Sequence, residues 1–386
     1  MARSPDDIPD ATLRLLLTPH VGPRTLEALE SRLGSHDRII GASVSDLMRV
    51  DGIGRTRAEK ILRNMQSADL DTERDAMANL GVRLILRGDA DYPELLAMIP
   101  DPPPGLWVRG ECREADRLAV AMVGSRKCTS YGRDQANRLA GLLAESGLTI
   151  VSGGARGIDG EAHRSTLRVG GRTIAVLGSG HARPYPPEHA ELFDRIADGH
   201  GAVVSEHPTH VGPRGEHFPQ RNRIISGLSI GVLVVEAARG SGALITARQA
   251  AEDHNREVMA LPGRVDSPAS AGCLRAIREG WAGLVTNHAE ILEQLDGAGH
   301  LIRGVVEAAH QSEAGRPSSG SLFDQTLTPG QQQILEALSE NSGPRLIDEI
   351  AAVTRLPIGQ LMGDLTWLEL RGRIRRDHRG VFLNSK

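Results

Sequence analysis

The chain has 386 residues, and 45 Lys and Arg residues against 49 Asp and Glu residues give a formal charge of -4, so any attraction for nucleic acid must come from a local basic surface. Hydrophobic residues at 40% and charged residues at 24% are typical of a globular chain, which excludes a mostly disordered or collagen-like protein. At roughly 100 to 200 residues per domain, we expect about two to four domains.

No segment predicts a membrane span or a secretory leader. The longest apolar runs, such as Ile230 to Val235, are far shorter than the ~20 residues of a spanning helix, and Met1 to Asp10 is acidic. The three cysteines, Cys112, Cys128 and Cys273, are widely separated and fit neither a disulfide framework nor a zinc site. We therefore expect a soluble, cytoplasmic protein with no membrane partner, plain thiols and no metal.

Residues 1–80 are predicted as an all-helical domain of the SAM or helix-hairpin-helix type. Short apolar-periodic segments are separated by two glycine turns, Val21-Gly22-Pro23-Arg24 and Asp51-Gly52-Ile53-Gly54-Arg55. The second turn precedes a helix whose backbone N–H groups would suit a phosphate, and a tight turn in a packing module explains it equally well. Residues 81–114 follow as a connector, with one short strand at Val82–Leu86 and the run Pro102-Pro103-Pro104, which no helix interior tolerates.

Residues 115–296 alternate short apolar runs with amphipathic stretches. Runs that are apolar on both faces are typical of a parallel sheet covered by helices on both sides. We therefore predict a doubly wound, Rossmann-like α/β domain with a mostly parallel sheet. The predicted strands are Ala119–Val123, Leu148–Ser152, Thr173–Leu177, Ala202–Ser205, Ile230–Val235, Glu257–Leu261 and Leu284–Thr286.

The last two segments are predicted as a flexible linker over 297–327 and a winged-helix domain over 328–386. The linker loses periodicity and gains small polar residues. After it come three helical patterns, at 331–340, 347–353 and 358–371, and then an alternating stretch from Arg373 to Leu383. The third helix carries Asp364 and Glu369 whereas the wing is basic, so DNA contact and protein contact are both open.

Glycine-rich loops follow four of the predicted strands. In a parallel sheet these loops meet at one edge, where helix N-termini attract anions and glycine lets backbone N–H groups approach a phosphate. Arg126, Lys127 and Arg156 add charge, and Arg221-Asn222-Arg223 lies at or just before the start of a further helix. Together they indicate a site for a phosphate-bearing ligand. The loops begin at Gly124, Gly153, Gly178 and Glu236.

The loops lack the signatures of the common nucleotide cofactors. No Gly-x-Gly-x-x-Gly follows the first strand, and no Gly-x-x-x-x-Gly-Lys-Ser/Thr is present, so no cofactor is expected. Asp159, Glu161, His163 and Glu236 are the titratable groups near the loops. Asp159 and His163 share a helical face, and a purely structural role explains both. Catalysis is not demanded.

Read in order, the loops resemble the DNA-processing protein A (DprA/Smf) family. The resemblance runs over about 180 residues and extends to the connector and to the helical and winged-helix modules at either end. It rests on motifs at Val123–Arg126, Ser152–Asp159 with Ala162-His163, Gly170–Gly178, Tyr185–Pro187, Phe218–Leu228, Val235–Ala237, Ser241–Ala247 and Leu261–Gly263.

The resemblance implies a cytoplasmic bacterial protein that binds and protects single-stranded DNA and loads a RecA-type recombinase, as in natural transformation. It further implies a protein that is not an enzyme and that forms a homodimer or larger homo-oligomer. By position, Arg126 matches a family residue implicated in DNA binding, and Arg168 and Arg172 occupy a similarly implicated region. The sequence departs from the family pattern at Leu274, where Asn is usual, and at Trp281, although Arg275 remains.

Aromatic residues make up only 3% of the chain, so base stacking cannot be extensive and binding should depend on phosphate contacts. Phe218 is the candidate for one stacked base, with a core position as the alternative. The predicted DNA-contacting residues are Gly124, Ser125, Arg126, Lys127, Gly153, Gly154, Arg156, Gly157, Arg168, Arg172, Phe218, Arg221, Asn222, Arg223, Ser241, Gly242, Thr246 and Arg275.

Two rival functions stay open at this point. The first is a nucleotide hydrolase or phosphoribohydrolase on a Rossmann-like sheet, with Asp159 or Glu236 as acid or base. The Pro-Gly-Gly-x-Gly-Thr loop of such enzymes is absent, since the comparable place reads Arg239-Gly240-Ser241-Gly242-Ala243-Leu244. The second is a duplex DNA binder that works through the C-terminal module.

Overall fold

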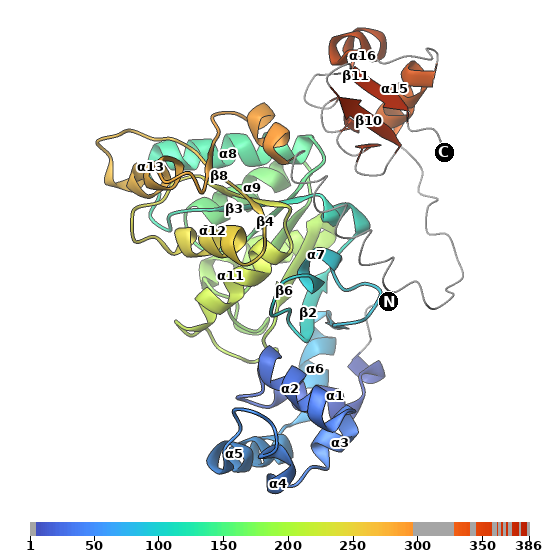
Figure 1. Cartoon of the computed structure of the whole chain (residues 1–386), viewed down its shortest axis with the longest axis vertical. Helices are drawn as coiled ribbons and strands as arrows, with labels where there is room; N and C mark the ends of the chain where they lie inside the picture. The colour runs from blue at the N-terminus through green and yellow to red at the C-terminus, as the bar shows by residue number, and fades with distance from the viewer. Residues whose placement is uncertain are drawn as a thin grey trace.

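The computed structural model describes residues 5–295, 328–339, 345–356, 361, 364–365, 368–369, 373–377 and 380–383 (Figure 1). The predicted linker at 297–327 and much of the third predicted C-terminal helix, 358–371, lie outside these residues. Within the described ranges, no helix combines the length and the apolar character that a membrane crossing requires.

The N-terminal part is helical, as predicted. Its core contains Leu26, Leu29, Ile39, Ile61 and Met65, which are all buried. The elements are η1 (Pro5–Asp7), α1 (Asp10–Leu17), α2 (Pro23–Leu33), α3 (His36–Ile40), α4 (Val44–Leu47), α5 (Arg55–Gln66) and α6 (Leu70–Leu80).

Two turns in this part have the same backbone shape. Gly22 and Gly54 precede α2 and α5 with nearly equal torsions (φ -84°, ψ 178° and φ -81°, ψ 169°). Two residues before each, the chain is left-handed, at His20 (φ 71°) and Gly52 (φ 77°). The two glycine turns noted in the sequence are therefore equivalent positions of a doubled helical hairpin.

The central sheet has nine strands in the order β1-β2-β6-β5-β4-β3-β7-β8-β9. All pairs from β6 to β9 along this order are parallel, whereas β1 and β2 are antiparallel to each other and β2 is antiparallel to β6. This confirms the predicted mostly parallel α/β fold. The strands are β1 (Val82–Leu86), β2 (Gly105–Gly110), β3 (Ala119–Val123), β4 (Thr149–Ser152), β5 (Thr173–Val176), β6 (Gly201–Ser205), β7 (Gly231–Val234), β8 (Glu257–Ala260) and β9 (Gly283–Leu284).

Alternate residues of each inner strand face two separate cores. Ala121 and Val123 pack on one side, with apolar residues of α11 and α12, and Val120 and Met122 pack on the other, with those of α8 and α9 (Figure 1). Burial on both faces explains the uninterrupted apolar runs of the strands. The helical elements are α7 (Glu94–Ala97), η2 (Glu114–Arg117), α8 (Ser130–Glu145), α9 (Ile158–Arg168), η3 (Pro187–His189), α10 (Ala190–Arg195), η4 (Ile196–His200), α11 (His217–Gly227), α12 (Gly242–Glu252), η5 (Pro268–Ser270) and α13 (Ala271–Arg278).

The segment predicted as a connector, 81–114, is part of the sheet. It contributes β1, which was predicted, and β2, which was not. Trp107 of β2 is buried and donates its indole N–H to Glu73 of α6 at 2.8 Å, and the same carboxylate oxygen accepts from the backbone N–H and hydroxyl of Thr209. The helical part is therefore tied to the sheet by a shared buried hydrogen-bond cluster.

The described residues after the linker follow the winged-helix order. Helices α15 (Pro329–Ser339) and α16 (Ile347–Thr354) are followed by an antiparallel hairpin of β10 (Ile374–Asp377) and β11 (Gly380–Leu383). Their shared core contains Ile334, Ile350, Leu365, Leu368 and Val381, among other buried residues.

Candidate nucleic-acid interface

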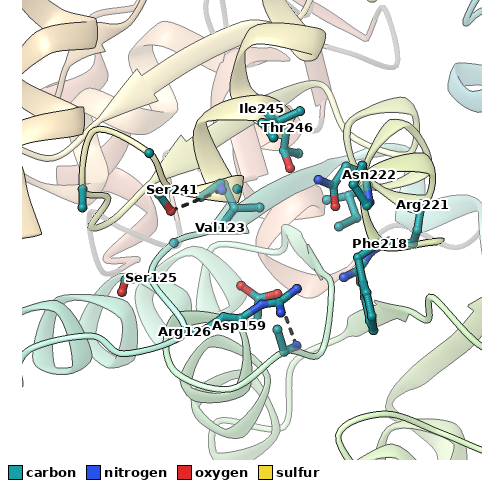
Figure 2. Close-up of a pocket in the computed structure, with 18 of the residues that line it drawn as sticks. Val123, Ser125, Arg126, Asp159, Phe218, Arg221, Asn222, Ser241, Ile245 and Thr246 are labelled. Atoms are coloured by element: carbon teal, nitrogen blue, oxygen red, sulfur yellow. Dashed lines mark hydrogen bonds between the residues drawn. The ribbon is translucent and has the colours of Figure 1, made fainter. Parts of the chain in front are cut away.

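The loops that follow β3 and β7 meet the N-terminal half of α11 at the carboxyl edge of the sheet, and a cavity of about 740 Å³ opens between them. Figure 2 shows Ser125 and Ser241 on one side of this cavity, with Phe218, Arg221 and Asn222 on the other. Ten predicted contact residues line it: Gly124, Ser125, Arg126, Lys127, Phe218, Arg221, Asn222, Ser241, Gly242 and Thr246.

The loop after β3 is held in place by Glu236, which lies two residues after the end of β7. The backbone N–H of Ser125 donates to the Glu236 carbonyl at 2.8 Å. The buried Glu236 carboxylate accepts from the backbone N–H of Thr129 at 3.0 Å and from its hydroxyl. These bonds occupy both carboxylate oxygens, so Glu236 shapes the loop and does not present a free acid or base to the cavity.

Arg126 and Lys127 give the cavity its positive charge. Both side chains are exposed, and in the described part of the chain neither forms an ion pair within 4 Å, unlike Arg156, Arg172 and Arg223. The Arg126 guanidinium lies 5.1 Å from the centre of the Phe218 ring. Asp159 is near enough to interact electrostatically with Arg126, but no described carboxylate oxygen lies within 4 Å of the Arg126 guanidinium, which can therefore donate to a phosphate.

The first turn of α12 supplies backbone donors to the same cavity. Ser241 is the N-cap, and its side chain accepts from the N–H of Ala243 at 3.3 Å. A Cβ built on Gly242 would have no atom within 4 Å, so the backbone is open there. The first turn carries no acidic side chain, and the positive end of the helix dipole favours an anion there.

Arg221 lines the cavity, but its guanidinium already donates hydrogen bonds within the protein. It is buried and donates to the carbonyls of Gly153, at 2.6 Å, and Val176. Burial lowers its pKa to about 10. Arg221 therefore fastens α11 to the ends of β4 and β5, a role that the sequence did not reveal.

Asp159 also lines the cavity, whereas His163 does not. Burial raises the pKa of the Asp159 carboxyl, against the effect of Arg221 and of the Ala155 N–H that donates to it at 3.3 Å. His163 is buried on the same helix and its Nδ1 lies 2.7 Å from the hydroxyl of Thr173. The two residues share a helix, as predicted, but no hydrogen bond joins them in the structure.

Three predicted glycines lie outside the cavity, because each packs directly against another part of the protein. A Cβ on Gly153 would lie 2.3 Å from the Arg221 guanidinium, and one on Gly157 (φ +75°) would lie 2.2 Å from the Ser125 carbonyl. Gly154 (φ +62°) likewise leaves room for the Phe193 ring. These glycines let neighbouring loops approach one another and do not face the ligand space directly.

The remaining predicted arginines are paired elsewhere. All five form ion pairs or hydrogen bonds with side chains outside the cavity, and Arg168 and Arg172 lie at the opposite, amino edge of the sheet. The pairs are Arg156 with Glu188, Arg168 with Asn137, Arg172 with Asp116, Arg223 with Glu206 and Asp101, and Arg275 with Glu279.

The sequence did not single out the apolar part of the lining. Ile225 and Ile245 line the cavity, and Ile245 is 53% exposed, which is unusual for an isoleucine in a helix. Tyr185 was also not predicted as a contact, although its ring lies 5.5 Å from that of Phe218. Two features of the sequence could have indicated these contacts. Tyr185 is an aromatic residue in a proline-rich loop, and Ile245 lies in the first helical turn after a glycine-rich loop.

Comparison with known proteins places the chain in a family. A family model described as DNA recombination-mediator protein A matches residues 83–296, which contain the sheet and the cavity. The chain belongs to this family. A DprA winged helix domain matches 322–378, and a SAM-like helix-hairpin-helix tandem matches 13–66, in agreement with the predicted end modules.

Individual relatives of the recombination-mediator family agree. Protein Smf of Synechocystis sp. is 35% identical over 378 residues, which cover 92% of this chain and 94% of the relative. Protein Smf of Escherichia coli is 41% identical and covers 73% of this chain and 72% of its own. The crystal structure of DNA processing protein A from Streptococcus pneumoniae is 32% identical, with a TM-score of 0.65, and covers 74% of this chain and 98% of its own.

Leu274 and Trp281, where the sequence departs from the family pattern, do not line the cavity. Trp281 lies under Arg248, whose guanidinium is 5.3 Å from the ring centre, and its indole N–H donates to Glu279 at 3.1 Å. Leu274 is half-buried on α13. Both residues belong to α13 and the turn after it, and no residue of that segment lines the cavity.

Proposed function

We propose that this chain binds single-stranded DNA through the cavity and delivers it to a RecA-type recombinase as a non-catalytic mediator. The observation that carries the proposal is the convergence on one cavity of Arg126 and Lys127, which have no ion-pair partner within 4 Å among the described residues, the N-terminus of α12 and the half-buried Phe218 ring. Phosphate contacts beside a stacking surface are the general means of holding a single strand without sequence preference. Membership of the recombination-mediator family supports the same role.

The hydrolase alternative finds less support. Glu236 is occupied by Thr129, and Asp159 is buried between the loops with Arg221 nearby. Among the described residues, no group of three His, Cys, Asp or Glu side chains could hold a metal ion. The contacts of both acids are those of residues that shape the loops.

Binding is tested by fluorescence anisotropy of a labelled poly-dT strand and of a matched duplex across a salt series. We expect tight binding of the strand, weak binding of the duplex, and a log-log salt slope of about -0.7 for each phosphate neutralised. Binding of nucleoside monophosphates with no binding of either DNA would contradict the proposal.

The mediator role needs a separate measurement. A RecA-type recombinase is added to a strand already coated with a single-strand-binding protein, and its DNA-dependent ATP hydrolysis is followed. The full-length chain should shorten the lag before hydrolysis. Size-exclusion chromatography with light scattering tests the proposed homodimer or larger homo-oligomer. An unchanged lag with normal strand binding would leave a strand binder that is not a mediator.

A further inference from the structure

Four side chains in and beside the cavity form one column, in which two aromatic rings lie between two arginines. The Arg126 guanidinium lies 5.1 Å from the centre of the Phe218 ring, the Phe218 and Tyr185 ring centres are 5.5 Å apart with a 57° tilt, and the Arg156 guanidinium lies 5.4 Å from the centre of the Tyr185 ring. The column therefore contains the same unit twice, an arginine over an aromatic ring.

The two units differ in position. Arg126 and Phe218 line the cavity, whereas Tyr185 and Arg156, from the loops after β5 and β4, do not. Both rings are half-buried, so each keeps part of its surface open to solvent. A Cβ on Gly178 would lie 2.9 Å from the Phe218 ring, so the first ring rests directly on the backbone of the β5 loop that leads to the second.

The arginines of the two units also differ in whether a carboxylate pairs with them. Arg126 has no carboxylate partner within 4 Å among the described residues, but Arg156 forms a two-pronged pair with Glu188, one prong at 3.0 Å, and donates to the Tyr185 hydroxyl at 3.0 Å. The Arg156 and Glu188 side chains are 48% and 49% exposed, so solvent weakens their attraction. A DNA phosphate can replace Glu188 at the guanidinium without a buried charge being left behind.

Resting on the proposed function, we propose that Tyr185 and Arg156 form a second stacking and phosphate site for the nucleotide next to the one on Phe218. The ring spacing of 5.5 Å exceeds the 3.4 Å between stacked bases of duplex DNA, so the two rings suit neighbouring bases of an extended strand. Each arginine covers a ring in the free protein. When DNA binds, the guanidinium turns to a phosphate and a base takes its place on the ring.

The proposal fixes the path of the strand. One segment fills the cavity between Ser125 and Ser241, and the strand leaves over Phe218 toward Tyr185 and the Glu188 side chain. Glu188 is then an internal competitor for Arg156. Removing its charge should strengthen binding of any strand long enough to reach the second site, which a purely structural role of Tyr185 does not predict.

The test uses the full-length chain and dT strands of about 4 and about 12 nucleotides, lengths within the range of known single-strand sites. Tyr185→Ala should weaken binding of the long strand by roughly 5- to 10-fold, the lower end of what one stacked base contributes, and weaken the short one less, because four nucleotides can fill the cavity in registers that leave the second site empty. Tyr185→Phe keeps the ring and should bind nearly as wild type. A 2-aminopurine base scanned along the long strand should lose its quenching at one position in Tyr185→Ala only.

The charge test does not depend on the fold of the Tyr185 variant. Glu188→Gln should tighten binding of the long strand, whereas Glu191→Gln, which removes an equal charge on neighbouring α10, should change it less. Equal effects of Glu188→Gln and Glu191→Gln, or an unchanged affinity and quenching profile in a folded Tyr185→Ala, would overturn the second site. If wild type binds neither strand, the proposed function itself fails, and the two failures are thereby distinguished.

Discussion

Replacement of Arg126 by alanine tests the cavity most directly. The side chain is exposed, lies over Phe218 and has no ion-pair partner within 4 Å among the described residues, so its loss should leave the fold intact. A hydrogen bond to a charged group contributes about 1.5 to 3 kcal/mol, so the Kd for a dT strand should rise by roughly 10- to 150-fold. Because one phosphate contact is lost, the salt slope should also fall by about 0.7.

The assay is anisotropy with labelled dT at several salt concentrations, with Arg117→Ala as the matched control. Arg117 is an exposed arginine in η2, at the amino edge of the sheet, and it pairs with Glu94 at 2.7 Å. Its replacement removes the same charge far from the carboxyl-edge loops and should leave the slope unchanged. Equal losses in both variants would mean that only net charge matters. A loss of affinity at Arg126→Ala with an unchanged slope would show that Arg126 contacts no phosphate.

Three further variants separate binding from stability. Gly157→Ala places a Cβ against the Ser125 carbonyl at a left-handed residue and should cost about 1 to 3 kcal/mol in urea unfolding, together with weaker DNA binding. Arg172→Met leaves the buried Asp116 unpaired and should lower the free energy of unfolding by about 3 to 5 kcal/mol, while the salt slope for DNA stays at the wild-type value. His163→Gln tests pH dependence: burial lowers the pKa of His163 to about 3, so wild-type stability is complete above about pH 6.5 and falls as the unfolded state takes up the proton. The variant should be less stable at pH 8 by about 1 kcal/mol. Because each pH unit below about 6.5 costs the wild type roughly 1.4 kcal/mol, urea titrations should show the difference vanish at about pH 6 and reverse below it; a constant difference would contradict the proton linkage.

The parallel part of the sheet was predictable because its strands carry a local signal. Burial on both faces makes them short, mostly apolar runs, and four of them are followed by a glycine-rich loop. Strand β2 carries no such signal. It is bounded by Pro104 and Glu111, contains three polar or small positions among six, and owes its place to antiparallel pairing with β6, about ninety residues later in the chain. Pairing at that distance is a property of the folded sheet.

The glycine loops were predictable from the sequence. Which of the nearby arginines have hydrogen-bond or ion-pair partners was not. Arg221, Arg223 and Arg126 look alike in the sequence, yet Arg221 fastens backbone carbonyls and Arg223 pairs with Glu206, while Arg126 remains available. The difference depends on which face of α11 turns inward and on carboxylates from other segments. A sequence motif shows that charge is present near the loops, and only the packed structure shows whether a partner neutralises it.

This distinction explains how a chain of net charge -4 can attract DNA. At the amino edge of the sheet, Arg172 and Arg117 are matched by Asp116 and Glu94, so they add little field beyond their own partners. At the carboxyl edge, Arg126 lies without such a partner beside the open N-terminus of α12. Charges more than about 8 to 10 Å away are screened at physiological salt, so a phosphate in the cavity responds to this local excess and not to the total. The affinity for a DNA strand should therefore follow the number of cations at this edge that have no ion-pair partner. A variant that places a carboxylate beside Arg126 should weaken binding as much as one that removes the Arg126 side chain.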